Sequence, residues 1–445
     1  MVLLAAAAAA LNMMGTKSYS TGLTFNSFPR YGRKLMSTMI NAVNVPTTTT
    51  TTKRSSSSSS TSPPWLMLPP VFQCMTNNKK QKLYEFYSLG LDRVLSVPNN
   101  NKRSMPIPSD DDDNDDDDDD LDIVGSSRGW FALFKNYYDL FLSNPLTGRH
   151  IKLPSLHPLS PEELIDVRNV VISSDDPFEQ DCRVLISCTP GDRLAFCCPA
   201  HTNPEWIRIG HPSTSFQFES LTYSSRQELF FCAKGPPGRT DHIEAWDLRD
   251  PLSPRMVPLA PVTVDKRNYP VASHSELESE LKYLCEYDAV FLVLSEHTDE
   301  LFQVQQYVLH RMGPDGSFAD HVYYEGDSDE SVSYKTVGFD VHKYEPKTGK
   351  MVYMDRNLGG LALFVGPHEG FALPADEYQG LKPNSIYYTD MYNSPHYKHG
   401  GHDIGIFNYE NETFSPCYYP CDLKSMTTKI TPNPIWFRPS PCAFI

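Results

Sequence analysis

The chain has 445 residues and a formal net charge of −16, with 37 Pro and an aromatic content of 12%. The many prolines exclude a fold built from long helices, whereas abundant Tyr and Phe suit β-strands. The acidic excess argues against binding to nucleic acid or to anionic membranes. The longest apolar run, Met1–Leu11, is shorter than the roughly 20 residues that cross a bilayer, so no membrane insertion is predicted.

Residues 1–62 form a compositionally biased N-terminal region. They are rich in Ala, Ser and Thr, and residues 1–84 contain nine Lys or Arg and no Asp or Glu. This composition is typical of an organellar transit peptide and predicts import into a mitochondrion or chloroplast. The alternatives are a tail without an address, with the protein in the cytoplasm or nucleus, and a secretory signal. The Thr and Ser tracts predict disorder over residues 1–62.

The folded domain is expected to span residues 63–445. The runs Lys82–Leu89 and Asp92–Pro98 alternate apolar and polar residues and predict a strand pair. Residues 99–120 follow, and within them Asp110–Asp120 contains ten Asp interrupted only by Asn114. Because so many like charges cannot pack together, this segment is predicted to be a disordered acidic insertion.

From Leu121 onward, short apolar runs recur in groups of about four. The first group contains Trp130–Phe134, Asp139–Ser143 and His150–Leu153, and Pro145 with Gly148 predicts a turn before the last run. Five further groups span residues 167–209, 216–248, 283–323, 333–373 and 385–416.

Groups of four strands at this spacing predict the blades of an all-β propeller. The early strand pair and the late run Ile435–Phe437 are expected to form one blade from both ends of the chain, which leaves no open sheet edge. This organisation predicts about seven four-stranded blades, with six as the alternative.

Five segments resemble, in the same order, the plant domain-of-unknown-function 295 (DUF295) proteins, also called KIB-type β-propellers. They are GSSRGW (Gly125–Trp130), Leu140–Pro154, Val337–Gly366, Leu373–Asp390 and Asp403–Cys417. The resemblance covers about residues 63–437 and implies a β-propeller. Many members carry an F-box and are thought to present substrates to SCF ubiquitin ligases. Residues 1–64 lack the helical apolar period of an F-box, so the chain resembles the organellar-type branch that has none.

Two patterns are candidate chemical sites. The segment Gly125–Gly129 matches G-x-S-x-G, but a strand-like run follows it where a nucleophile elbow needs a helix, so a turn is predicted. The second pattern combines three histidines with two cysteines as candidate zinc ligands: His396, His399, His402, Cys417 and Cys421. Neighbouring Pro and Gly residues predict a solvated loop there, because structural zinc needs four fixed ligands.

The remaining candidates are predicted to be structural. Cys197 and Cys198 are expected to point to opposite faces of a strand, one inside and one outside. The segment Asp241–Glu244 is expected at the surface. Gly359-Gly360 and Gly235–Gly238 lack the Lys-Ser/Thr that follows a phosphate loop. The ten Cys contain no CxxC pair, and those in apolar runs predict reduced, buried thiols.

These observations predict a non-catalytic, protein-binding β-propeller. No catalytic, cofactor-binding or metal-binding residue is proposed, and the expected partner is an unidentified protein rather than nucleic acid. The chain is expected to be a monomer. An F-box-type substrate receptor and a propeller hydrolase are the alternatives.

Overall fold

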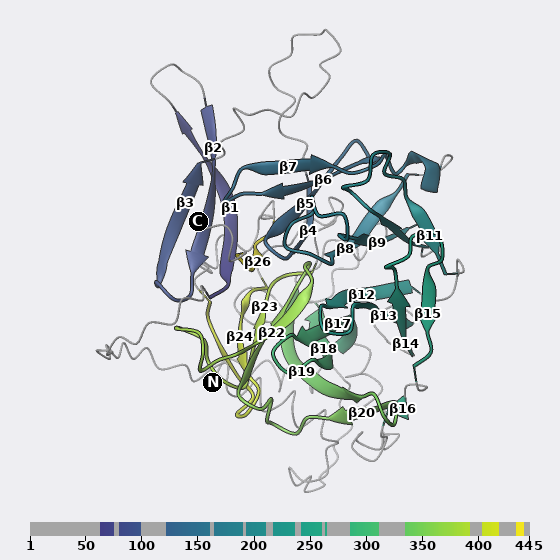
Figure 1. Ribbon diagram of the computed structural model, residues 1–445. Coiled ribbons are helices and arrows are strands. Elements are labelled where there is room, and N and C mark those ends of the chain that lie inside the picture. Colours follow the sequence, from purple (N-terminus) through teal and green to yellow (C-terminus); the bar gives the residue numbers. More distant parts are fainter. Residues whose placement is uncertain are drawn as a thin grey trace, which may run out of the picture.

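The fold is given by a computed structural model. It describes residues 63–74, 80–98, 122–160, 164–189, 193–210, 217–235, 242–259, 263–264, 285–310, 334–391, 403–417 and 433–439. Within these residues the regular secondary structure consists of strands and one short 3-10 helix, η4 (His157–Leu159). Figure 1 shows the strands gathered into small sheets around a common centre.

The first three blades are antiparallel and four-stranded. Blade 1 has the order β26 (Ile435–Phe437), β1 (Trp65–Cys74), β2 (Lys80–Ser88) and β3 (Arg93–Pro98). Blade 2 contains β4 (Asp122–Ser127), β5 (Trp130–Lys135), β6 (Asp139–Asn144) and β7 (Arg149–Lys152). Blade 3 contains β8 (Asp166–Ile172), β9 (Val184–Thr189), β10 (Arg193–Cys197) and β11 (Ile207–Ile209).

The other three blades complete the ring. Blade 4 contains β12 (Gln217–Ser224), β13 (Leu229–Gly235), β14 (His242–Asp247) and β15 (Arg255–Val257). Blade 5 contains β17 (Cys285–Ser295), β18 (Glu300–His310), β19 (Tyr334–Glu345) and β20 (Lys350–Tyr353), with β16 (Thr263–Val264) at its edge. Blade 6 has the order β22 (Gly370–Pro374), β21 (Leu361–Val365), β23 (Ser385–Tyr388), β24 (Gly405–Asn408) and β25 (Thr413–Ser415).

Six apolar clusters lie between successive blades and hold the ring together. Strand β5 shows how the sequence builds them: Trp130 and Ala132 pack toward blade 3, whereas Phe131 and Leu133 pack toward blade 1. Because side chains on a strand alternate between its two faces, each blade can contribute to two clusters. The cluster between blades 6 and 1 closes the circle, where Phe364 meets Trp436 at 5.2 Å between ring centroids.

The first and last described strands meet in blade 1, as the sequence predicts. Strand β26 pairs antiparallel with β1, and the register places Trp436 opposite Leu66. Figure 1 shows β26 near the centre of the molecule. The all-β propeller and its closure by both ends of the chain are therefore confirmed.

The described blades number six, the alternative to the predicted seven. Three sequence groups over residues 283–416 were expected to make three blades, but they make two. Strand β19 continues blade 5 by pairing with β18, and β21 and β22 join blade 6. Strand β17 has 11 residues and joins two of the expected short strands, at residues 283–287 and 289–295. The run expected at residues 319–323 lies outside the described residues.

Asparagine side chains stabilise the turns between the two outermost strands of blades 2 and 6. In blade 2, Asn144 Oδ1 accepts hydrogen bonds from the backbone N–H groups of Leu146 and Thr147, and Gly148 adopts a φ of 66°. The same Asx geometry recurs in blade 6, where Asn408 Oδ1 accepts from Glu410 and Asn411. The turn predicted from Pro145 and Gly148 is confirmed.

Candidate functional site

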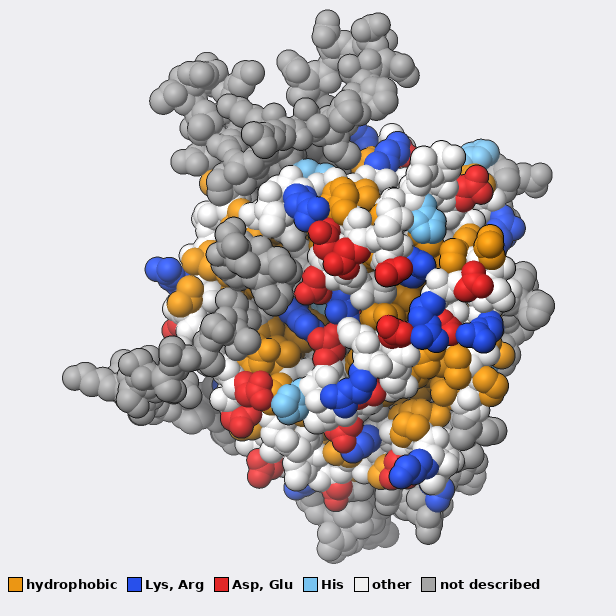
Figure 2. Space-filling model, in the orientation of Figure 1, with side chains coloured by type: hydrophobic (Ala, Val, Ile, Leu, Met, Phe, Trp, Pro, Cys, Tyr) orange, Lys and Arg blue, Asp and Glu red, His pale blue; other side chains and the backbone are white. Residues whose placement is uncertain are grey.

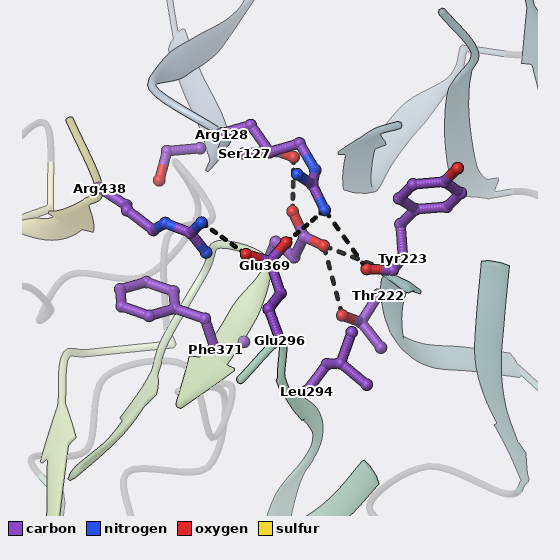
Figure 3. A pocket seen from close by; sticks show the side chains of 11 residues that line it. Ser127, Arg128, Thr222, Tyr223, Leu294, Glu296, Glu369, Phe371 and Arg438 are labelled. Carbon is purple, nitrogen blue, oxygen red and sulfur yellow. Dashed lines mark hydrogen bonds and ion pairs between the residues drawn. The ribbon is translucent and has the colours of Figure 1, made fainter. Parts of the chain in front are cut away.

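A small pocket lies among the innermost strands of the ring. Its lining residues come from five blades: Ser126, Ser127, Arg128, Thr222, Tyr223, Leu294, Glu296, Glu369, Gly370, Phe371 and Arg438. Most of them lie at or just beyond the ends of β4, β12, β17 and β26, and Glu369 directly precedes β22. The cavity volume is ≈ 20 Å³, which is room for about one water molecule. Figure 3 shows the charged side chains converging on this space.

Arg128 is a buried charged group at the site, with its side chain 9% exposed. It lies in the tight turn from β4 to β5, where Arg128 and Gly129 have φ values of 48° and 82°. Its Nη2 atom donates to Glu296 Oε1 at 2.6 Å and to Ser225 Oγ at 2.9 Å. Its Nε atom makes no hydrogen bond among the described residues. The guanidinium group also lies 5.4 Å from the Tyr223 ring centroid, within cation–π range.

The charge of Arg128 is maintained by the carboxylates around it. Burial acts to lower the pKa of Arg128, but the charges of Glu369, Glu296 and Asp175 outweigh burial and raise that pKa. Asp175 contributes from 3.6 Å, at Nη1. Arg128 is therefore a permanent cation inside the ring.

Glu296 bridges two arginines across the pocket. Its Oε1 atom accepts from Arg128, and its Oε2 atom accepts from Arg438 Nη2 at 2.6 Å. Burial acts to raise the pKa of Glu296, but the charges of Arg438 and Arg128 lower it overall. Glu296 is thus held ionised between blades 1, 2 and 5.

Glu369, in blade 6, connects the inner strands of blades 2 and 4. Its Oε2 atom accepts from Ser127 Oγ at 2.6 Å, and its Oε1 atom accepts from Tyr223 N at 3.1 Å and Thr222 Oγ1 at 3.3 Å. Burial raises the pKa of Glu369, and the Arg128 charge opposes that rise. Ser127 Oγ also accepts from Ile172 N in blade 3 at 3.0 Å. The network of Arg128, Glu296, Glu369, Arg438 and Ser127, here called the hub, therefore reaches all six blades.

His368 precedes Glu369 but does not take part in a serine relay. Its Nδ1 atom lies 2.8 Å from the carbonyl oxygen of Glu369, and burial lowers the pKa of His368 to about 4. The ring is therefore neutral at physiological pH. The Ser127 hydroxyl donates to the Glu369 carboxylate instead, so no described imidazole accepts its proton.

The structure tests several of the candidates found in the sequence. The segment Gly125–Gly129 comprises the end of β4 and the predicted turn to β5, but its Arg128 forms part of the hub. His396, His399, His402 and Cys421 lie outside the described residues, and Cys417 is buried. Among the described residues no group of three or more His, Cys, Asp or Glu side chains is placed to hold a metal ion.

The expectation for the cysteine pair is half right. Cys197 packs in the cluster toward blade 2 and Cys198 in the cluster toward blade 4, so the two side chains point to opposite faces. Neither is outside, since Cys197 is 0% and Cys198 4% exposed. Neighbouring blades cover both faces of the sheet at the end of β10, which the sequence alone did not reveal. Other described thiols are also free and buried, among them Cys182 and Cys232.

The surface prediction for Asp241–Glu244 is wrong for Glu244. Its side chain is only 13% exposed and pairs with Lys234 Nζ at 3.3 Å. Strand pairing explains this, because Lys234 lies opposite His242 on the neighbouring strand and Glu244 shares a strand face with His242. His242 is more exposed than Glu244, and Asp241 lies outside the described residues.

The structure describes Gly359-Gly360 and only the first residue of Gly235–Gly238. Gly359 and Gly360 form a turn in which both residues have positive φ. Gly235 is the last residue of β13, and residues 236–238 lie outside the part of the chain that the structure describes. The expectation that Gly235–Gly238 is not a phosphate loop therefore stays a prediction for residues 236–238.

Sequence analysis missed the four charged residues of the hub. They lie far apart along the chain: Arg128, Glu296, Glu369 and Arg438. Three of them share one local pattern, a charged residue directly after the last residue of an innermost strand. That pattern identifies strand ends, but only the closed ring brings them together.

The comparisons with known proteins match this architecture. The family described as KIB1-4 beta-propeller matches residues 94–408. A putative F-box protein of Arabidopsis thaliana is 39% identical over 56 residues, which are 13% of this chain and 15% of that protein. That match therefore spans a small part of the length of the curated relative.

Two solved structures are distant likenesses. The β-propeller domain of Cps50 (Swd1) from Myceliophteria thermophila shares 8% identity at a TM-score of 0.30, covering 78% of this chain and 85% of that one. The β-fructofuranosidase of Schwanniomyces occidentalis shares 8% identity at a TM-score of 0.24, covering 81% and 62%. Likenesses at these values say nothing about activity. The family match, which covers more than half of the chain, shows that this protein belongs to the KIB1-4 beta-propeller family.

Proposed function

We propose that the protein is a non-catalytic β-propeller that binds another protein through the face on which the hub lies. The observation that carries this proposal is the hub itself, because it ties the ends of inner strands from all six blades together. A surface fixed in this way loses little conformational entropy when a partner binds. Loops around such a rim can therefore provide affinity while the strands keep their positions.

The contacts of Ser127 and His368 support a non-catalytic role. The Ser127 hydroxyl is held by the Glu369 carboxylate and by the backbone of Ile172. A nucleophilic serine needs a base within hydrogen-bond reach to accept its proton, and His368 is turned toward a backbone carbonyl oxygen. The cavity also has room for little more than a water molecule.

The surface charges support a protein partner over nucleic acid. Figure 2 shows Lys and Arg side chains interspersed with Asp and Glu side chains on the face it presents. Nucleic-acid binding depends on a continuous basic patch, and the chain carries a net charge of −16. No helix in the described part of the chain has the length and apolar character needed to cross a membrane.

A photo-cross-linking experiment tests the binding face. A photoreactive amino acid at Ser225, which contacts Arg128 at the rim of the pocket, should capture a stoichiometric partner from a plant cell extract. The same group at Tyr137 is the control, because Tyr137 is 57% exposed and lies in the turn from β5 to β6, at the end of the strands opposite to Arg128. Capture at Tyr137 alone, or at neither position, would contradict the proposal.

A second candidate function is that of a substrate receptor in a ubiquitin ligase. It is favoured by the short match to a protein named as a putative F-box protein. This role requires a Skp1-type adaptor to bind the full chain. A binary binding assay against such an adaptor, with an F-box domain as the positive control, decides it.

We also infer that residues 1–62 direct the protein into a mitochondrion or chloroplast. The support is the absence of acidic residues together with scattered Lys and Arg. A fluorescent protein fused behind residues 1–64 should then accumulate in one of these organelles. Diffuse fluorescence throughout the cytoplasm would contradict the inference.

A further inference from the structure

The hub has unused hydrogen-bond donors but few unused acceptors. Both carboxylate oxygens of Glu296 and both of Glu369 accept at least one hydrogen bond. Among the described residues, Arg128 Nε makes no hydrogen bond, and Arg438 donates only through Nη2. The Nε and Nη1 groups of Arg438 are therefore available. A site with spare guanidinium donors is suited to a ligand that accepts hydrogen bonds.

We propose that this pocket binds the carboxylate of an acidic side chain from the partner protein, and that Glu296 occupies the two arginines when no partner is bound. The inference rests on the proposed protein-binding function and names the chemistry of its contact. Glu296 follows β17 in a turn, and its side chain is 30% exposed. It can therefore turn outward without disturbing the apolar clusters.

Charge and geometry favour a carboxylate over other groups. An incoming carboxylate that replaces Glu296 leaves the net charge of the site unchanged, whereas an incoming Lys or Arg would meet two guanidinium groups. The planar guanidinium edge of Arg438 matches a carboxylate in a bidentate arrangement. The side chain of Arg438 is 32% exposed, so a ligand can reach it from solvent.

The apolar part of the lining strengthens such a contact. Leu294 and Phe371 line the same pocket, and Figure 3 shows Phe371 near Arg438 and Leu294 near Thr222. Charged hydrogen bonds gain strength where water is excluded, because the effective dielectric constant falls. The cavity of ≈ 20 Å³ holds about one water molecule, so a carboxylate fits there only when Glu296 has turned outward.

The test uses the full chain and a fluorescein-labelled peptide with two Glu residues between Leu residues. A matched peptide carries Gln in place of both Glu. We expect the Glu peptide to bind about tenfold more tightly than the Gln peptide, the difference for one charge-assisted contact. Glu296→Gln should tighten binding of the Glu peptide by a similar factor, because it removes the internal competitor. Arg438→Gln should weaken it.

Arg356→Gln is the matched control. Arg356 is exposed and pairs with Glu412 in blade 6, away from the pocket lining. Its substitution should leave peptide binding unchanged. If Arg438→Gln fails to fold, the expected gain in Glu296→Gln still decides the matter, since a purely structural Glu296 would not increase affinity when removed.

Two results would overturn the inference: equal affinity for the Glu and Gln peptides, or no gain in the Glu296→Gln variant. The proposed function fails separately. A partner captured at Ser225 that binds the variants and the wild-type chain equally would refute the carboxylate site and leave the protein-binding role intact. Binding of the Glu peptide without any partner captured at Ser225 would refute the protein-binding role and leave carboxylate binding by the pocket intact.

Discussion

Asp403 shows how burial determines the state of a single residue. The carboxyl group accepts hydrogen bonds from the backbone N–H of Thr336 at 3.0 Å and from the Thr336 hydroxyl, and the Asp403 N–H donates to Asp390 at 3.2 Å. Burial, followed by the charge of Asp390, raises the pKa of Asp403 to about 7. The folded protein therefore holds a proton on Asp403 over a range of pH in which the unfolded chain does not.

We predict that this proton makes stability depend on pH. The folded pKa lies above the unfolded value of about 4, so the stabilising contribution is present at low pH and is lost as pH rises from about 4 to 7. At about 1.36 kcal/mol per pH unit, the loss is at most about 4 kcal/mol. Asp403→Asn should flatten the dependence of the free energy of unfolding on pH in this range, measured by urea denaturation. The exposed Asp376→Asn should not, and equal slopes for wild type and Asp403→Asn would refute the prediction.

Arg183 is a buried cation that contacts backbone carbonyl groups rather than acids. Its guanidinium group donates to the carbonyl oxygens of Leu248, Arg249, Gln180 and Cys182 at 2.9–3.0 Å. Leu248 and Arg249 follow β14, so this side chain joins blade 3 to blade 4. Four backbone carbonyl oxygens therefore receive a hydrogen bond from this one side chain.

Replacement of Arg183 by Met should therefore be costly. The aliphatic part of the side chain is kept, but the carbonyl groups lose their donors, and we expect a loss of about 3 kcal/mol. Thermal unfolding of the full chain measures it as a lower melting temperature. Arg226→Met is the control, because Arg226 is exposed in the turn before β13. A similar melting temperature for the two variants would show that the carbonyl contacts contribute nothing.

At the scale of strands, the bounds of short strands and the position of a turn can be predicted from the sequence. The runs Trp130–Phe134 and Asp139–Ser143 correspond to β5 and β6 within one residue at each end. The turn at Pro145 and Gly148 was predictable because only a few residue types suit such backbone angles. The number of blades was not, because it depends on whether β18 and β19 pair across residues 311–333, which separate them.

Gly370 fixes the junction of blades 5 and 6. Strands β17 and β22 pair in parallel there, and a Cβ atom on Gly370 would lie 2.3 Å from the carbonyl oxygen of Leu292. We predict that Gly370→Ala separates the two strands at a cost of about 1–3 kcal/mol. Gly125→Ala is the comparison, since its Cβ would lie 3.3 Å from the nearest backbone oxygen. Hydrogen exchange at Leu294 and Phe371 should rise only in Gly370→Ala; unchanged exchange there would contradict the prediction.

At the scale of the whole molecule, the hub is a consequence of ring closure. No local pattern places Arg438 beside Glu296, because the two residues are 142 positions apart in the chain. They meet only because β26 returns to blade 1, next to the first strand. The sequence therefore predicts the closure and the individual strand ends, whereas the site depends on the order of all six blades.

The last strand has little backbone pairing with which to hold the ring closed. Strand β26 has three residues and pairs with β1 over those three alone in the described part of the chain. The side chains of β26 must therefore supply the remaining stabilisation of the closed ring. Trp436 is fully buried and lies edge-on to Phe364 and Tyr387, with centroid distances of 5.2 and 5.7 Å. Its carbonyl oxygen also accepts from Ser126 Oγ in blade 2.

Trp436→Ala should therefore separate blades 6 and 1 rather than only weaken the packing of the core. Truncation of a buried Trp costs about 3–5 kcal/mol, and here it removes the contact between blades 6 and 1. We expect a large fall in melting temperature, together with faster hydrogen exchange in β1 and β2 before the other blades unfold. Leu252→Ala, at a fully solvated side chain, should change neither quantity. If Trp436→Ala lowers stability but exchange rises equally in all blades, the ring does not depend on β26 for its closure, and the stabilisation by Trp436 is that of any core residue.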